Sequence, residues 1–218
     1  MICASLTEKT ADGMVKVGNE TKADLVEVRL DFLEKTGDIE KLSKIRKPLI
    51  ATCMPCWEGG RFKGSEKERV ELLERTLGFA SHVTIELRTP SRLRNRLIRQ
   101  ARLKKVKTII AFHDFKKTPS KESIKRIIEQ ESRIGDIAKV AFMPKSQQDV
   151  LNLINILMEK KPKARVIALS MGSLGAITRI IGPFLGSYLT YGSPVEGKEA
   201  GPGQLTVDQL QRMTSAFK

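Results

Sequence analysis

Eight short apolar runs recur along the chain at intervals of about 27 residues, and this repeat limits the possible folds more than any other feature. None of the runs alternates cleanly between apolar and polar residues, which is typical of parallel strands covered on both faces. The runs are Ile2–Leu6, Leu25–Asp31, Leu49–Cys53, Val83–Leu87, Val106–His113, Ile137–Met143, Val166–Met171 and Ser187–Tyr191. We therefore expect eight parallel strands.

Amphipathic segments with recognisable helix starts lie between these runs. Ser65 and Thr206 each begin a capping box, and Ser146 can cap the segment that follows it. Pro119 fits the first turn of a helix. Only Asp38–Arg46 is predicted to be a short helix at best.

Eight strand–helix units in one chain predict a (β/α)8 TIM barrel, an α/β fold, as a single domain over residues 1–218. A doubly wound open sheet is the alternative. It usually has fewer strands and a glycine-rich first turn, but neither G-x-G-x-x-G nor a P-loop is present.

The composition narrows the class of partner. A net charge of +14 suits either nucleic-acid phosphates or a small anionic substrate. The basic residues are spread through helical stretches such as Ser91–Lys107, and aromatic residues that could stack on bases make up only 5%. We therefore expect a small-molecule ligand and no nucleic-acid partner.

No apolar run approaches the roughly 20 residues that a membrane span needs. Met1–Thr10 lacks the basic and long apolar regions of a signal peptide. These features predict a cytoplasmic protein with no membrane association. The odd number of cysteines argues against a secreted disulfide framework, and the C-x-x-C pair Cys53 and Cys56 lacks enough further ligands for a zinc site.

Lys139 lies inside one of the apolar runs, between Gly135 and Pro144. Desolvation disfavours the ammonium form, so a lysine there would be partly neutral and able to attack a carbonyl and form an imine. The alternative is a strand-end lysine whose amine reaches water.

Other polar residues also fall where barrel strands end, which is where active sites of this fold lie. Glu27 and Arg29 share one face of the second strand, His113 ends the fifth, and Arg179 follows the seventh. Each could instead be a structural ion pair or a satisfied histidine. Together with Lys139 they predict a site with an imine-forming amine, a proton carrier and a carboxylate-binding guanidinium.

The motifs in this chain resemble those of the type I 3-dehydroquinate dehydratases. The matching segments are Asp24–Asp31, Glu58–Gly60, Ile85–Leu87, His113–Phe115, Lys139–Pro144, Ser170–Gly172 with Gly175 and Arg179, Phe184 with Gly186–Ser187, and Pro202–Gln204. The resemblance implies a homodimeric hydro-lyase of the shikimate pathway of aromatic amino-acid biosynthesis, working without cofactor or metal.

The resemblance also implies roles for single residues. Lys139 would form a Schiff base with the ketone of 3-dehydroquinate, and His113 would move the protons in a syn elimination of water that gives 3-dehydroshikimate. Glu58 would orient and tune His113, and Arg179 would bind the substrate carboxylate. The other implied substrate-binding residues are Ser5, Glu27, Arg29 and Gln204 for hydroxyl groups and the closing loop, and Met171 and Phe142 for packing of the ring.

The chain departs from the family pattern in three places. Met54 stands where an arginine is usual at the end of strand three, and Arg61 is a possible replacement. The closing loop has Ala200 and Gly201 where a serine is usual, and the first strand starts at Ile2, so we expect no N-terminal hairpin. These changes concern binding and loop closure, so catalysis is expected to survive.

Two other functions remain open at this point. A class I aldolase would also use an imine, and Gly172–Gly175 is a candidate for the phosphate-binding turn that such enzymes often have. A basic nucleic-acid-binding protein would show binding that weakens steeply with salt.

Overall fold

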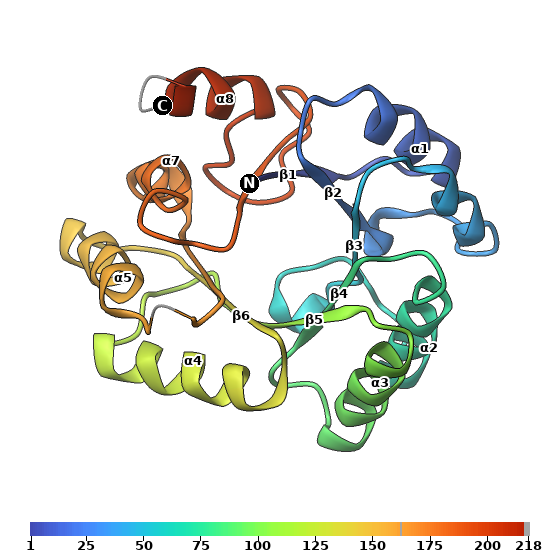
Figure 1. The fold of residues 1–218 in the computed structure, drawn as a ribbon, viewed down its shortest axis with the longest axis horizontal. Helices are drawn as coiled ribbons and strands as arrows, with labels where there is room; N and C mark the ends of the chain where they lie inside the picture. Colours follow the sequence, from blue (N-terminus) through green and yellow to red (C-terminus); the bar gives the residue numbers. More distant parts are fainter. Residues whose placement is uncertain (162, 216–218) are drawn as a thin grey trace.

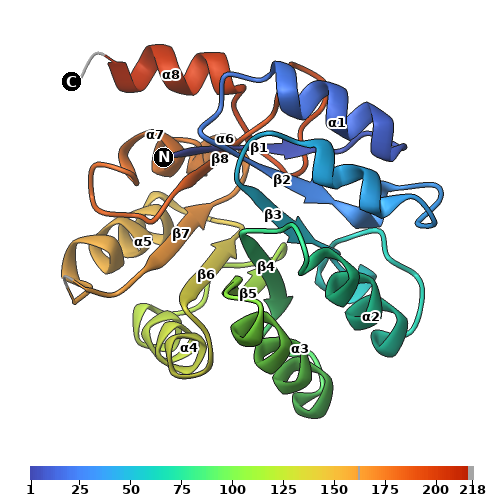
Figure 2. The same ribbon diagram turned by 45° about the vertical axis from the view of Figure 1, so that its right-hand side comes forward.

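Eight parallel strands follow one another around a ring, and the helices lie outside it (Figures 1 and 2). The structure is a computed structural model that describes residues 1–161 and 163–215. The strands are β1 Ile2–Leu6, β2 Leu25–Arg29, β3 Leu49–Thr52, β4 His82–Glu86, β5 Lys107–Asp114, β6 Ile137–Phe142, β7 Val166–Ser170 and β8 Thr190–Gly192. The predicted (β/α)8 barrel is confirmed, and its first strand is the one expected at Ile2.

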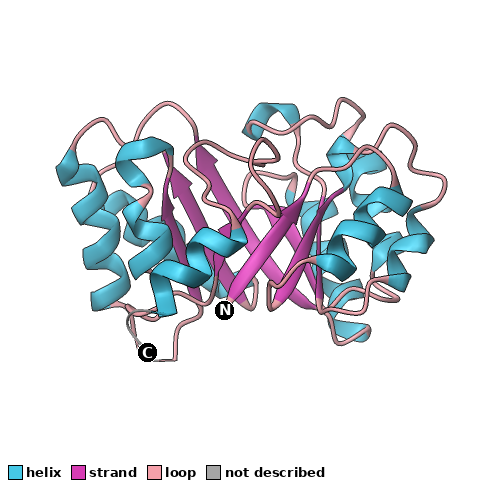
Figure 3. Ribbon diagram, turned by 90° about the horizontal axis from the view of Figure 1, so that it is seen from above, coloured by secondary structure: helices cyan, strands magenta, loops and turns pink. Residues whose placement is uncertain are grey.

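The helices alternate with the strands along the chain, and Figure 3 shows the strands in the middle of the molecule with helices on both sides. The α-helices are α1 Ala11–Glu20, α2 Glu66–Thr76, α3 Ser91–Leu103, α4 Lys121–Ile134, α5 Gln147–Glu159, α6 Gly172–Gly175, α7 Ile177–Ile181 and α8 Val207–Ser215. Short 3-10 helices follow β2 and β3: η1 Leu30–Phe32, η2 Ile39–Lys44 and η3 Cys56–Glu58. The prediction of only a short helix at 38–46 is confirmed, and within the described ranges no helix is long and apolar enough to cross a membrane.

The predicted helix starts are mostly confirmed. Ser65 and Thr206 both make reciprocal capping boxes, and in the first the Glu68 backbone N–H donates to Ser65 Oγ over 3.2 Å. The prediction for Pro119 is wrong, because Ser120 caps α4 and the proline precedes the cap. Ser120 Oγ accepts the backbone N–H of Ser123, and proline has no side-chain oxygen that could do this, so the helix begins after Ser120.

The ring is closed unevenly between its last two strands. The sheet order runs β7-β6-β5-β4-β3-β2-β1-β8, so β8 pairs with β1. Between β7 and the segment before β8, the Tyr188 N–H donates to the Val166 carbonyl over 2.8 Å, at the N-terminal ends of the strands. No strand pairing continues from there within the described residues. We call this junction the seam.

Alternation of side chains along the strands separates two apolar layers. The layer inside the barrel consists of Cys3, Leu25, Ile50, Ile109, Ile137, Ala141, Ile167, Leu169, Met171, Leu189 and Tyr191. The other layer lies between the strands and the surrounding helices. The interior layer forms the floor on which the polar residues at the C-terminal strand ends rest.

Candidate active site

A cavity of about 70 Å³ opens among the C-terminal ends of the strands. Residues of the loop between β8 and α8 (193–206), which we call the lid, line part of it. Eight of the ten predicted site residues also line it: Ser5, Glu27, Arg29, His113, Lys139, Met171, Arg179 and Gln204. The barrel therefore brings together side chains that are up to 199 positions apart in the sequence.

Lys139 points into the barrel from the middle of β6, and only 6% of its surface is exposed. Its Nζ lies 3.7 Å from Glu27 Oε1 and 4.0 Å from the centre of the Tyr191 ring. The amine is thus enclosed in the cavity, and the alternative of a strand-end lysine that reaches water does not describe it.

Glu27 supplies the negative charge beside this amine. Its carboxylate accepts hydrogen bonds from Ser5 Oγ and Thr52 Oγ1, each over 2.9 Å. Burial alone would raise the pKa of Glu27, but the positive charges of Lys139 and Arg29, together with the two hydrogen bonds, outweigh burial and lower it. Glu27 is therefore a carboxylate held in fixed orientation.

His113 and Glu58 form the second part of the site. Glu58 Oε1 accepts the backbone N–H of His113 over 2.7 Å and lies 3.3 Å from its Nδ1. Burial lowers the pKa of His113, and the charge of Lys139 lowers it further, although the hydrogen bond to Glu58 opposes the shift. A neutral imidazole whose Nδ1–H faces Glu58 carries its lone pair on Nε2, so it can act as a base.

Arg88 and Glu86, at the end of β4, each pair with a residue of another element. Arg88 donates to Glu58 Oε2 from Nε over 3.1 Å and from Nη2 over 2.9 Å. Glu86, two positions earlier on β4, instead pairs with the fully buried Arg69 of α2.

Arg179 is a buried cation with no anion beside it. It is 4% exposed, and its guanidinium donates only to the carbonyls of Tyr191 (3.4 Å) and Pro202 (3.2 Å), which leaves Nε without a partner. Burial lowers its pKa to about 10. Across residues 1–161 and 163–215, no carboxylate forms an ion pair with it, so its charge is available to an anionic ligand.

Arg29 differs from Arg179 because it is already paired. Its Nε and Nη2 donate to the two carboxylate oxygens of Asp31 over 2.8 and 2.7 Å. Asp31 also accepts the backbone N–H groups of Met54 and Arg61, over 3.2 and 3.0 Å. The remaining Nη1 of Arg29 reaches the Ala200 carbonyl over 3.4 Å. Arg29 therefore connects the β2 and β3 strand ends with the lid.

Two further contacts hold the lid against the barrel. Gln204 Nε2 donates to Ser5 Oγ over 3.2 Å, and the Gly172 N–H donates to the Pro202 carbonyl over 3.1 Å. Gly203 has a φ of +70°, and a Cβ there would lie 2.1 Å from the Gly172 carbonyl oxygen. This position therefore requires glycine, which explains why the lid can approach α6 so closely.

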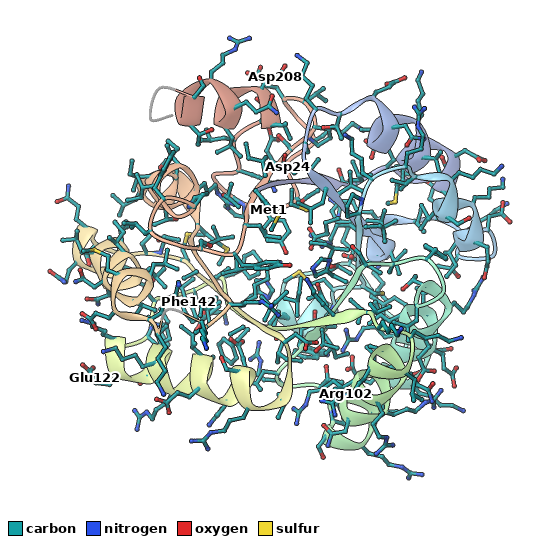
Figure 4. All side chains as sticks on the ribbon, in the orientation of Figure 1. Met1, Asp24, Arg102, Glu122, Phe142 and Asp208 are labelled. Atoms are coloured by element: carbon teal, nitrogen blue, oxygen red, sulfur yellow. The ribbon has the colours of Figure 1, made fainter. Side chains whose placement is uncertain are left out.

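Phe142 does not lie in the cavity. It is fully buried in the layer between the strands and helices, and Figure 4 places it between β6 and the helices α4 and α5. Because side chains alternate along a strand, Lys139 and Ala141 point inward while Phe142 points outward. The prediction that Phe142 packs on the substrate ring is wrong. Met171 does line the cavity.

A model of the type I 3-dehydroquinase family matches residues 2–218. The chain belongs to this family. A 3-dehydroquinate dehydratase from Methanocaldococcus jannaschii is 39% identical over 218 residues, a match that covers 98% of this chain and 97% of the relative.

Solved structures agree with the assignment to the type I 3-dehydroquinases. The 3-dehydroquinate dehydratase of Geobacillus kaustophilus has a TM-score of 0.89 at 30% identity, covering 99% of this chain and 90% of that chain. The type I enzyme of Clostridium difficile, solved with covalent modified comenic acid, has a TM-score of 0.88 at 28% identity, covering 99% and 91%. The family and the fold predicted from the motifs are confirmed.

Proposed function

We propose that this type I 3-dehydroquinase converts 3-dehydroquinate into 3-dehydroshikimate through an imine on Lys139. The observation that carries the proposal is that one cavity is lined by a buried amine, a neutral imidazole and a guanidinium without a counter-ion. The curated relative from M. jannaschii is named 3-dehydroquinate dehydratase. The adduct in the C. difficile enzyme supports a covalent step.

The first step joins the substrate to Lys139. The amine nitrogen of Lys139 adds to the ketone carbon, and the former ketone oxygen leaves as water with two protons of the ammonium group, which leaves a protonated imine. Glu27, 3.7 Å from Nζ, stabilises positive charge on this nitrogen, and so does the face of the Tyr191 ring. The imine then acts as an electron sink for the next step.

His113 carries out both proton transfers of the elimination. Its Nε2 removes a proton from the carbon next to the imine, the released electron pair forms a C=C bond, and the π pair of the C=N bond moves onto the nitrogen to give an enamine. The enamine then expels the hydroxyl group of the adjacent carbon, which leaves as water with the proton from His113. Because His113 both takes the proton and returns it to the hydroxyl group, the proton and the hydroxyl group leave from the same face of the ring. Hydrolysis of the imine frees the product and Lys139.

The groups around Lys139 and His113 bind the substrate. Arg179 can hold the carboxylate with its planar fork of N–H donors. Ser5, Glu27 and Gln204 form a hydrogen-bonded set that can bind ring hydroxyls, while Met171 packs against the ring. Arg29 positions the lid over them through Ala200.

The short helix α6 argues against the aldolase alternative. A phosphate-binding turn needs free backbone N–H groups at a helix start. Here the Gly172 N–H already donates to Pro202 of the lid, and Gly203 packs on the Gly172 carbonyl. The site is therefore built for lid closure over a ring.

Three further parts of the proposal are carried by the family alone. They are a role in the shikimate pathway of aromatic amino-acid biosynthesis, a homodimeric state and a cytoplasmic location. We also propose that residues 1–218 act as a single catalytic domain without cofactor or metal.

Borohydride trapping tests the covalent step directly. Incubation with 3-dehydroquinate and borohydride should reduce the imine and leave a mass adduct on the peptide that contains Lys139. The Lys139→Ala variant should lose both adduct and turnover, while Lys41→Ala, a surface change at a lysine paired with Asp12, should keep both. Full dehydratase activity in Lys139→Ala would refute a mechanism through an imine on Lys139.

Substitution of His113 separates the proton transfers from imine formation. In His113→Ala the adduct should still form, whereas turnover should fall by about a hundredfold or more. Turnover equal to that of the unchanged protein would exclude His113 as the proton carrier.

A further inference from the structure

A second and larger cavity, of about 490 Å³, lies directly outside the catalytic cavity. The two share Arg29, Phe115 and the lid residues Ala200 and Gly201 as walls. A molecule that reaches the catalytic cavity past these residues therefore passes through the outer one first. We call this outer cavity the vestibule.

Arg61 is held in the wall of the vestibule in an ordered position. Its guanidinium carbon lies 4.0 Å from the centre of the Phe32 ring, and its backbone N–H donates to Asp31 Oδ2 over 3.0 Å. Stacking on an aromatic face leaves the N–H groups at the edge of a guanidinium available for hydrogen bonds. Anchoring at both the backbone and the ring reduces the entropy lost when a ligand binds.

The charges around the vestibule show which ligand it suits. The Arg29 guanidinium is occupied by Asp31, whereas no carboxylate of the described ranges pairs with Arg61, and its side-chain N–H groups have no described acceptor. Glu199 of the lid also lines the vestibule, with one carboxylate oxygen accepting the Gly197 N–H over 3.0 Å. One free guanidinium and one carboxylate thus face the passage.

We propose that the vestibule is a transient binding site for the carboxylate of a hydroxylated ring acid, with Arg61 as its receptor. This inference rests on the proposed function and extends it: the carboxylate pairs with Arg61 on the way in, then transfers to Arg179 as the ring enters the catalytic cavity. Glu199 repels the same carboxylate and slows the passage. Arg61 is therefore a positioning residue for access, and the completed complex does not contain its contact.

A transit site has a kinetic signature that separates it from other roles. Losing a contact made only on the way slows association and dissociation by the same factor and leaves the Kd unchanged. A contact in the final complex would instead raise the Kd, mostly through faster dissociation. A residue that only packs on Phe32 would change neither rate.

The experiment measures both rate constants for quinate, which has the carboxylated, hydroxylated ring but no ketone and so cannot form an imine. Stopped-flow fluorescence of Trp57, the single tryptophan, follows binding. In Arg61→Gln both rates should fall about fivefold with the Kd within about twofold, since an exposed charge pair contributes modestly. In Glu199→Gln both rates should rise. In Arg75→Gln, which removes a guanidinium paired with Glu40 outside the vestibule, neither should change.

Salt provides a second readout. The association rate of the unchanged protein should fall with ionic strength more steeply than that of Arg61→Gln. Unchanged rates in Arg61→Gln, a fivefold higher Kd in that variant, or no quinate binding by the unchanged protein would each overturn the proposal. If the protein binds quinate in this way but does not dehydrate 3-dehydroquinate, the proposed function fails and the vestibule stands.

Discussion

Replacing Arg179 with methionine should make the unliganded protein more stable while weakening substrate binding. Burial lowers the pKa of Arg179 from 12.5 to about 10, which corresponds to a cost of about 3 kcal/mol for keeping the charge at neutral pH. The variant also loses the two hydrogen bonds to Tyr191 and Pro202, worth roughly 1–2 kcal/mol together. The net gain should be about 1–2 kcal/mol.

The effect on binding has the opposite sign and is larger. A substrate carboxylate that pairs with Arg179 loses a buried guanidinium that, unlike Arg29, has no carboxylate partner within the described residues. Truncation of one partner of such a buried pair costs roughly 2–5 kcal/mol, or about 30-fold to several-thousand-fold in affinity. Arg179→Lys keeps the charge without the planar fork, so its affinity for the substrate should lie between those of the unchanged protein and Arg179→Met.

Two measurements decide the matter. Calorimetry without ligand should show Tm raised by roughly 2–8 °C in Arg179→Met, and steady-state kinetics should show a much higher KM for 3-dehydroquinate. A lower Tm of the unliganded variant would show that Arg179 is a structural residue. An unchanged KM would show that the carboxylate binds elsewhere.

Three further predictions concern residues near Lys139 and His113. In Glu58→Gln the pKa of His113 should fall further, because a carboxylate that favours the imidazolium is lost; the acid limb of kcat/KM should move to lower pH, and turnover should drop about tenfold or more. Burial raises the pKa of Glu86 from 4.5 to about 7, so the protonated carboxyl contributes about 3 kcal/mol to the free energy of unfolding below pH 4.5, and this contribution is lost as pH rises through 7. Urea unfolding across this range should show a free energy of unfolding that depends less on pH in Glu86→Gln. Tyr191→Phe should keep turnover because the ring beside Lys139 remains, whereas Tyr191→Leu should lose about tenfold or more in an activity assay.

The sequence was sufficient to predict the barrel and the two central residues for a physical reason. A lysine inside an apolar strand and a histidine at the end of the neighbouring one can be recognised from local pattern, and parallel strands bring them to one edge. Lys139 and His113 are therefore visible without coordinates.

The errors and omissions share a different cause. Phe142 was assigned to the substrate although it stands an odd number of positions from Lys139 and so points to the opposite face. Arg88 was missed as the partner of Glu58, 30 positions away, and Asp31 as the acceptor of the Met54 and Arg61 N–H groups, because these contacts join separate loops. Tyr191 reaches Lys139 only after β8 has closed against β1, which no local pattern reveals.

The seam makes the barrel behave like a split ring that is pinned at one rim. The pin is the Tyr188–Val166 hydrogen bond at the N-terminal rim, whereas at the active-site rim no strand ladder joins β7 to β8 within the described chain, and the two sides meet through the Gly172–Pro202 and Arg179–Tyr191 contacts. Arg179 and the lid follow the two strands that flank the split, whereas Lys139 and His113 stand on β6 and β5, which are joined by a continuous ladder. The interruption of the ladder therefore lies beside Arg179 and the lid. The spacing of Lys139 and His113 is set by the ladder between β5 and β6, away from that interruption.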